Sequence, residues 1–191
     1  MKGCSFSSSC LRIFVVAFVC VGSFAWSGCL VISLQPAYDD QSVFFDEALL
    51  GQWENAEDGE RAAIERGEWR SYRITYTDRT ATRVFQGNLT KVGVAMLLDV
   101  TEMRGADPGP LLVPVHGLIR VTIAGDTLTA ARLNYDRFIR ARTQKAIGLP
   151  PSAVDDRRNA VITAPTGELR QWLAKVPADA FEAPATFTRK P

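Results

Sequence analysis

The sequence predicts a mainly β domain with a minor α content, in which an antiparallel meander forms a barrel or a strongly curved sheet. Apolar and polar residues alternate with a period of two in several stretches between residues 72 and 133. Tight-turn sequences separate these stretches, and helical periodicity begins only after residue 134. Short antiparallel strands linked by tight turns, with two short helices in the C-terminal half, favour such an architecture.

The first part of this domain begins with a helical turn and then becomes extended. Apolar residues beside acids from Phe44 to Leu50 predict one turn of helix, which Gly51 ends before the chain extends at Trp53. Residues 54–67 are polar and charged. We interpret them as a loop that holds at most a short helix around residues 61–66.

The middle of the chain is expected to consist of strands. Tyr72 to Tyr76 alternates as a half-buried strand does, and Asp78-Arg79 predicts the turn of a hairpin. Residues 93–100 are almost wholly apolar, which is typical of a strand covered on both faces. The remaining predicted segments are a strand over 80–90, a loop over 105–110, a strand over 112–123, a turn at 125–126 and a strand over 127–133.

Two helices are expected in the last third of the chain. Tyr135, Phe138, Ile139 and Arg142 recur with helical spacing, so residues 135–146 predict an amphipathic helix that ends before Gly148. Thr166 is expected to cap a second helix that runs through residue 175. Short strands are predicted over 160–164 and 185–188, the second of which closes the sheet.

A short motif near the start of the domain refines the expected architecture. The segment from Asp46 to Trp53, with Gly51-Gln52-Trp53, resembles the Gly-x-Trp entry of lipocalin-like barrels. In that family a turn of helix leads into the first strand, and the tryptophan plugs one end of the barrel. A lipocalin carries its long helix after the last strand, whereas here two helices interrupt the strands. The resemblance therefore implies a lipocalin-like or open β-barrel.

The N-terminal segment has the three-part layout of a secretory signal. Lys2 and Arg12 precede an apolar stretch over 13–25, and the small residues Ser27-Gly28 stand before Cys29. Trp26-Ser27-Gly28-Cys29 resembles the lipobox of bacterial lipoproteins, in which the leader is removed and the cysteine becomes the lipidated N-terminus. The resemblance implies a signal peptide over 1–28, a lipid-anchored tether over 29–41 and a single β-rich domain over 42–191.

Cysteine placement agrees with export. All four cysteines lie within the first 29 residues, so the exported domain carries one thiol and no disulfide framework. The resemblance implies a bacterial cell-envelope protein with its domain outside the cytoplasm. It favours the outer membrane if there are two membranes, because Leu30 is not the aspartate that retains relatives at the inner one.

An uncleaved anchor remains an alternative to lipidation. Residues 13–34 form an apolar stretch of 22 residues without a charge, which is long enough to cross a hydrocarbon core of ~30 Å. A soluble secreted product is a third possibility.

Charge is balanced overall but unevenly distributed. Two of the 22 basic residues lie in the leader, which leaves 20 against 21 acidic ones and no bulk attraction to nucleic acid. Residues 39–68 carry ten acids and two bases, whereas residues 132–158 carry seven bases and three acids. One interpretation is that the two regions are solvated faces that attract each other across the fold. Alternatively, a candidate contact surface faces anionic lipid, polysaccharide or a protein; it comprises Arg137, Arg140, Arg142 and Lys145.

Few residues carry recognisable catalytic chemistry. His116 is the only histidine, so metal sites built from several histidines or cysteines are excluded, and no metal or other cofactor is indicated. No Gly-x-Ser-x-Gly elbow and no phosphate-binding glycine pattern is present. His116 is either a partly buried residue with local partners or, with a carboxylate, the base of an envelope hydrolase. Asp99 and Glu102 could form a pair of catalytic carboxylates, but they lie three residues apart on or just past one predicted strand, so we expect their side chains to diverge.

Four aromatic residues form a candidate ligand site. Trp53, Trp69, Tyr72 and Tyr76 suit either one end of a barrel that binds an apolar ligand or the packed core. The leading hypothesis is a non-catalytic binding or structural module of the cell envelope. Its expected partners are the membrane, through N-terminal acyl chains, and an apolar ligand or an envelope protein.

Overall fold

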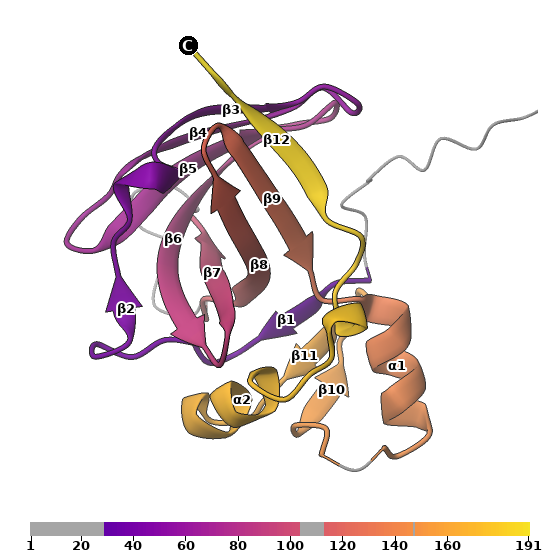
Figure 1. Cartoon of the computed structure of the whole chain (residues 1–191). Coiled ribbons are helices and arrows are strands. Elements are labelled where there is room, and N and C mark those ends of the chain that lie inside the picture. Colours follow the sequence, from indigo (N-terminus) through magenta and orange to yellow (C-terminus); the bar gives the residue numbers. More distant parts are fainter. Residues whose placement is uncertain (1–28, 104–112, 147) are drawn as a thin grey trace, which may run out of the picture.

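Eight antiparallel strands close into a barrel in the computed structural model, which describes residues 29–103, 113–146 and 148–191 (Figure 1). Seven strands follow one another as a meander, and the last strand lies between the seventh and the first, which closes the barrel. They are β3 (Gly51–Asn55), β4 (Glu60–Arg66), β5 (Ser71–Thr77), β6 (Thr82–Val92), β7 (Ala95–Glu102), β8 (His116–Ala124), β9 (Thr127–Arg132) and β12 (Ala185–Lys190). The predicted fold class is confirmed.

The barrel interior is one of two hydrophobic cores. Strand alternation directs every second side chain inward, so that Trp53 faces Ala62 on β4 and Ile64 faces Ile74 on β5. The buried members of this interior core are Leu49, Trp53, Ala62, Ile64, Tyr72, Ile74, Phe85, Leu89, Leu98, Val100, Val121, Leu128 and Phe187.

A turn of 3₁₀ helix packs against the start of the first barrel strand, as the sequence predicts. This element, η1 (Glu47–Leu49), buries Leu49 completely, and the indole N–H of Trp53 donates a hydrogen bond of 2.9 Å to the Leu49 carbonyl. Arg189 of β12 lies 4.2 Å above the Trp53 ring and donates to the carbonyls of Ala48 and Leu50. The last strand, the first strand and η1 are thereby joined at one end of the barrel.

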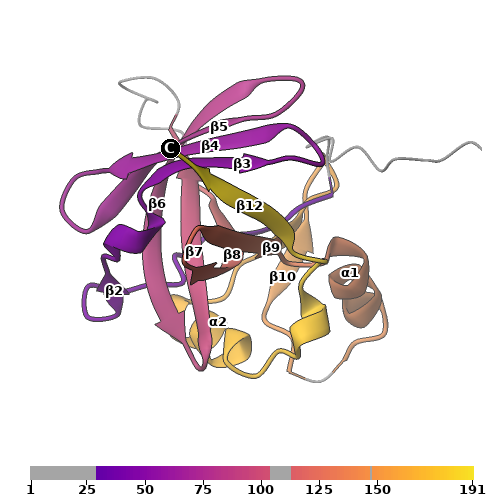
Figure 2. The same cartoon turned by 45° about the horizontal axis from the view of Figure 1, so that its top comes forward.

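An outer layer covers part of the barrel wall (Figures 1 and 2). Strand β1 (Val31–Ser33) pairs with the start of β8 and, in parallel, with β11 (Ala160–Ile162), which pairs with β10 (Ser152–Val154). Helices α1 (Tyr135–Thr143) and α2 (Thr166–Leu173) and the 3₁₀ helix η2 (Ala178–Ala180) lie on this side, whereas β2 (Val43–Phe44) pairs with β6. The second core lies beneath this layer and includes Leu97, Leu118, Phe138, Ile162 and Leu169.

Residues 54–67 differ from the prediction of a loop with a short helix. They contain the end of β3, a turn and the whole of β4. The alternation was hidden because Glu60, on the inward-facing side, is an acid and Ala62 is small. The backbone nevertheless forms a regular ladder with β5.

Two further predictions need correction, and others lie outside the described residues. Within residues 29–41, expected to be a tether, β1 is part of the sheet and Ala37 is fully buried. Thr166 is the first residue of α2, and the capping position is Pro165, which provides no side-chain cap. The leader, with Trp26, Ser27 and Gly28, and the predicted loop at 105–110 lie outside the described residues.

Candidate functional site

Cys29 is exposed and lies two residues before a strand. The Leu30 amide donates to the Asn159 side chain at 3.1 Å, and the Ala160 amide donates to the Leu30 carbonyl at 2.7 Å. These bonds tie the backbone next to Cys29 to the turn between β10 and β11. The cysteine is therefore held at a defined place on the surface.

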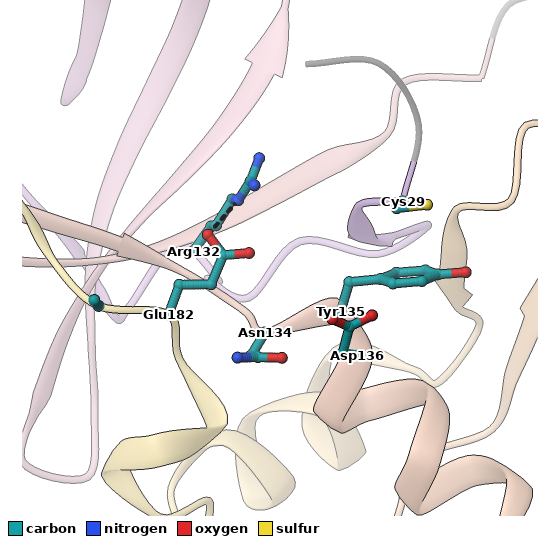
Figure 3. A pocket seen from close by; sticks show the side chains of 7 residues that line it. Cys29, Arg132, Asn134, Tyr135, Asp136 and Glu182 are labelled. Atoms are coloured by element: carbon teal, nitrogen blue, oxygen red, sulfur yellow. Dashed lines mark hydrogen bonds and ion pairs between the residues drawn. The ribbon is translucent and has the colours of Figure 1, made fainter. Parts of the chain in front are cut away.

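An open hollow of ≈ 470 Å³ surrounds this cysteine (Figure 3). Its lining combines the N-terminal end of α1 with the ends of β9 and of the segment before β12, and consists of Cys29, Arg132, Asn134, Tyr135, Asp136, Glu182 and Ala183. Arg132 donates to Glu182 at 2.6 Å. Partial burial and, after it, the adjacent Cys29 sulfur raise the pKa of the Tyr135 phenol, which stays protonated at neutral pH.

The residues that line the hollow include the Cys29 thiol but no histidine. A cysteine nucleophile needs a base within hydrogen-bond reach. The chain has a single histidine, His116, and it does not line this hollow. The neighbouring Tyr135 phenol keeps its proton at neutral pH and therefore does not act as that base.

The predicted contact surface lies on and just beyond α1. Arg137 forms an ion pair with Asp179 of η2. Arg140, Arg142 and Lys145 are exposed, and among the described residues they have no ion-pair partner. Of the four residues predicted to form the contact surface, Arg137 is therefore neutralised by an ion pair, whereas the charges of the other three are exposed and not paired within the described residues.

The acidic and basic regions of the sequence form their ion pairs elsewhere. In the acidic region, Glu47 pairs with Arg66, Asp58 with Arg79, and Glu54 with both Arg61 and Lys190. In the basic region, Arg132 and Arg137 pair with Glu182 and Asp179. None of these salt bridges joins residues 39–68 to residues 132–158, although the charge of Arg132 acts on the buried carboxyl of Glu60.

The four candidate ligand-binding aromatics do not form one group. Trp53 and Tyr72 are buried at the η1 end of the barrel, where the Tyr72 hydroxyl donates to the Asp46 carbonyl at 3.0 Å and its ring stacks on Phe45. Trp69 is 63% exposed in the turn between β4 and β5. Tyr76 is half-buried. A second hollow lies between α1 and α2, and none of the four aromatics lines either that hollow or the one beside Cys29.

His116 forms a buried pair with Asp99 on the barrel wall. The Nδ1 atom lies 2.6 Å from Asp99 Oδ1, and the other carboxylate oxygen accepts from the Ala37 amide at 2.7 Å. Asp99 is 1% exposed and His116 8%, as the interpretation of a histidine with local partners predicts. Ser33, opposite His116 in the β1–β8 ladder, is fully buried and donates to the Gln35 carbonyl. An aspartate that orients a histidine is common in catalysis, but this serine is out of reach of a substrate.

Glu60 is a candidate residue that the sequence analysis missed. It is buried on the inward-facing side of β4, at the opposite end of the barrel from η1, and it accepts a hydrogen bond from Tyr76. Burial, assisted by the nearby carboxylates of Asp58 and Asp78, raises the pKa of its carboxyl. The available signal was its spacing of two and four residues before Ala62 and Ile64.

The described residues add little else that is recognisable. No group of three or more His, Cys, Asp or Glu side chains is arranged there to hold a metal ion. No helix in that part of the chain is long and apolar enough to cross a membrane. No protein-family model, curated protein or solved structure matches this chain. The fold defines an eight-stranded antiparallel β-barrel domain.

Proposed function

We propose that this chain is a cell-envelope lipoprotein, anchored through acyl chains on Cys29, whose barrel is a non-catalytic binding or structural module outside the cytoplasm. The position of Cys29 carries the proposal. It is exposed, directly follows a leader that resembles a lipoprotein signal peptide, and stands two residues before β1. An enzyme that processes or acylates this residue needs such access.

The barrel interior supports a module that binds a partner on its surface. The interior core is occupied by large side chains such as Trp53, Tyr72 and Phe85, and the hollow beside Cys29 and the one between α1 and α2 lie outside it. We therefore favour an envelope protein over an apolar ligand inside the barrel. The helical turn before Gly51-Gln52-Trp53 supports the finer proposal that the barrel is lipocalin-like.

An envelope hydrolase that uses His116 is the alternative, and the contact between His116 and Asp99 is the observation that favours it. A working base must reach a substrate proton within about 3 Å or through one water. His116 is 8% exposed, and it lines neither the hollow beside Cys29 nor the one between α1 and α2. These facts favour the non-catalytic proposal.

The experiment is a comparison of two cysteine variants expressed with the leader intact. We expect the parent chain and Cys20→Ala to incorporate labelled fatty acid and to sediment with membranes. Cys29→Ala should incorporate no fatty acid, because the thioether forms on the sulfur of Cys29. The measurements are the mass of the mature N-terminus and the membrane-bound fraction.

Two outcomes would contradict the proposal in different ways. A parent chain that keeps its leader, carries no fatty acid and sediments with membranes indicates the uncleaved anchor, since residues 13–34 then span the bilayer. A parent chain that is cut but not acylated and found in the soluble fraction indicates a secreted protein.

A further inference from the structure

We propose that a basic face beside Cys29 lies against an anionic phospholipid surface and fixes the orientation of the barrel on the membrane. The basic face comprises Arg142 and Lys145 at and just after the end of α1, and Arg157 and Arg158 in the turn between β10 and β11. All four side chains are exposed. Arg140 is also exposed, but it projects from the opposite side of α1 to Arg142 and is not part of this face. The inference rests on the proposed function in one respect, which is that the chain is tethered to a membrane at residue 29.

The attachment point allows little freedom. Cys29 is followed by one residue and then by β1, which is hydrogen-bonded on both sides. Two extended residues reach about 7 Å at most. The lipid headgroups must therefore lie close to the elements that surround the start of β1.

The elements beside Cys29 are those that carry the basic face. Tyr135 of α1 lies next to Cys29 in the hollow of Figure 3. Arg142 is seven residues further along the same helix stripe, about 10 Å along its axis. On the other side of Cys29, the Asn159 side chain accepts a hydrogen bond from the Leu30 amide. The positive charge of the neighbouring Arg158 acts to lower the pKa of the Tyr135 phenol, which places Arg158 near the same hollow.

The charges of this region leave a surplus of cations. Six basic residues lie between Tyr135 and Arg158, against the acids Asp136, Asp155 and Asp156. Arg137 is neutralised by Asp179, and Arg132 pairs with Glu182 at the edge of the hollow. Asp155 accepts hydrogen bonds from the amide and the side chain of Asn159 within its own turn, whereas Asp136 and Asp156 are exposed acids. The free charges that face outward beside the anchor are therefore mostly positive.

An anionic bilayer gives these charges a partner. Each Lys or Arg near such a surface is worth about 1 kcal/mol, roughly a fivefold preference, and the attraction decays over about 8 Å in physiological salt. The tether already holds the domain at the surface. The cations therefore need only change the ratio between tethered domains that contact the membrane through α1 and tethered domains that rotate freely. Three of them are enough to change this ratio more than tenfold.

The test places a fluorophore on the lipidated full-length chain in vesicles that contain an energy acceptor in their headgroups. One label is attached at Thr143→Cys on α1, and the control label at Glu68→Cys in the turn between β4 and β5, at the far side of the barrel in Figure 1. We expect strong transfer from position 143 and weak transfer from position 68 on vesicles with 30% phosphatidylglycerol. The difference should fall on pure phosphatidylcholine or in 0.5 M salt.

Charge-reversal variants give the decisive comparison. Arg142→Glu, Lys145→Glu and Arg158→Glu together should abolish the difference between the two labels on anionic vesicles. The matched variant Arg73→Glu, Arg79→Glu and Lys91→Glu changes the net charge equally on exposed barrel positions and should preserve it. Circular dichroism verifies that both variants are folded.

The possible failures are distinguishable. Equal transfer from both labels, or transfer that is independent of lipid charge, overturns the oriented surface while the chain remains on the vesicles. The vesicles contain no other protein. A basic face that binds only a protein partner would therefore also give equal transfer from both labels. A chain that does not remain on vesicles of either kind refutes the tether and with it the proposed function.

Discussion

At the scale of single residues, Glu60 is the least expected side chain of the barrel interior. A carboxylate is stabilised by water, and burial removes that stabilisation. The hydrogen bond from Tyr76 and the charge of Arg132 offset part of the cost, but the net effect is a raised pKa. Buried polar groups with a shifted pKa often mark functional sites, and Glu60 lies at the end of the barrel away from η1.

We predict that Glu60→Gln stabilises the domain at neutral pH. Glutamine keeps a carbonyl acceptor for Tyr76 and carries no charge to desolvate. The folded-state pKa of Glu60 exceeds its ordinary value of 4.5, so the charge costs nothing well below pH 4.5, where both states are protonated. The cost appears as the pH rises from 4.5 through the folded-state pKa and is constant above it.

Urea unfolding of the parent chain and of Glu60→Gln between pH 4 and pH 8 tests this sign. The gap in unfolding free energy should be near zero at pH 4 and should favour the variant at pH 8. Glu57→Gln, in the exposed turn that follows β3, is the matched control and should change neither value. A gap that widens toward acidic pH would show that the folded state stabilises the ionised form.

At the scale of elements, the local pattern of apolar residues and turns decided what was predictable. Residues 72–76 alternate, residues 93–100 are almost wholly apolar and residues 127–133 follow a turn sequence, and each of these segments lies in or overlaps a barrel strand. Strand β4 lacks such a pattern because Glu60 faces inward, and β1 was masked by the apolar leader that continues into it. The pairing of β1 with both β8 and β11 is a long-range contact that no local pattern encodes.

The candidate site was predictable to a similar extent. Cys29 and the α1 cations follow from local sequence, and the structure describes both on the surface. The pairing of His116 with Asp99 depends on the register between β7 and β8, which sequence spacing does not specify. The four aromatics are close in sequence, but the turn between β4 and β5 directs Trp69 outward while Tyr72 faces the core.

Asp99 is predicted to hold the segment after β1 against the barrel. Asp99→Ala leaves the Ala37 amide and the His116 ring without their carboxylate, and a buried group that loses its partner costs about 1–3 kcal/mol. With two such groups, we expect a loss of about 2–4 kcal/mol in unfolding free energy. Hydrogen exchange at residues 31–37 should accelerate before the barrel unfolds.

Two variants bracket this prediction. Asp99→Asn keeps an acceptor oxygen for the Ala37 amide and should lose less stability than alanine. Asp40→Ala removes an exposed acid from the same segment and should be within about 0.5 kcal/mol of the parent. Equal effects of Asp99→Ala and Asp40→Ala would show that the contact with His116 and Ala37 contributes little to the fold.

At the scale of the whole molecule, the two cores lie on opposite faces of the same strands. On β7, Leu98 points into the barrel and Leu97 into the core under the helices. On β8, Val121 points into the barrel and Leu118 into the core under the helices. The barrel wall is therefore shared between the two cores. The outer layer also carries Cys29 and the basic face, so its stability determines how firmly the barrel is held relative to the tether.

We predict that the barrel and the outer layer unfold in one transition. Loss of β1, α1 and α2 would expose Leu97 and Leu118, and loss of the barrel would remove the surface on which the helices pack, so neither part is stable without the other. Trp53 reports on the interior core, and Trp172, in edge-to-face contact with Phe138, reports on the outer one. Variants with phenylalanine at the other three tryptophan positions isolate each signal. In each variant the fluorescence midpoint in urea should coincide with the loss of far-ultraviolet circular dichroism. If Trp172 becomes exposed at a lower urea concentration than that at which the dichroism is lost, the helices form a separate unit. The basic face would then be joined to the barrel too loosely to orient it.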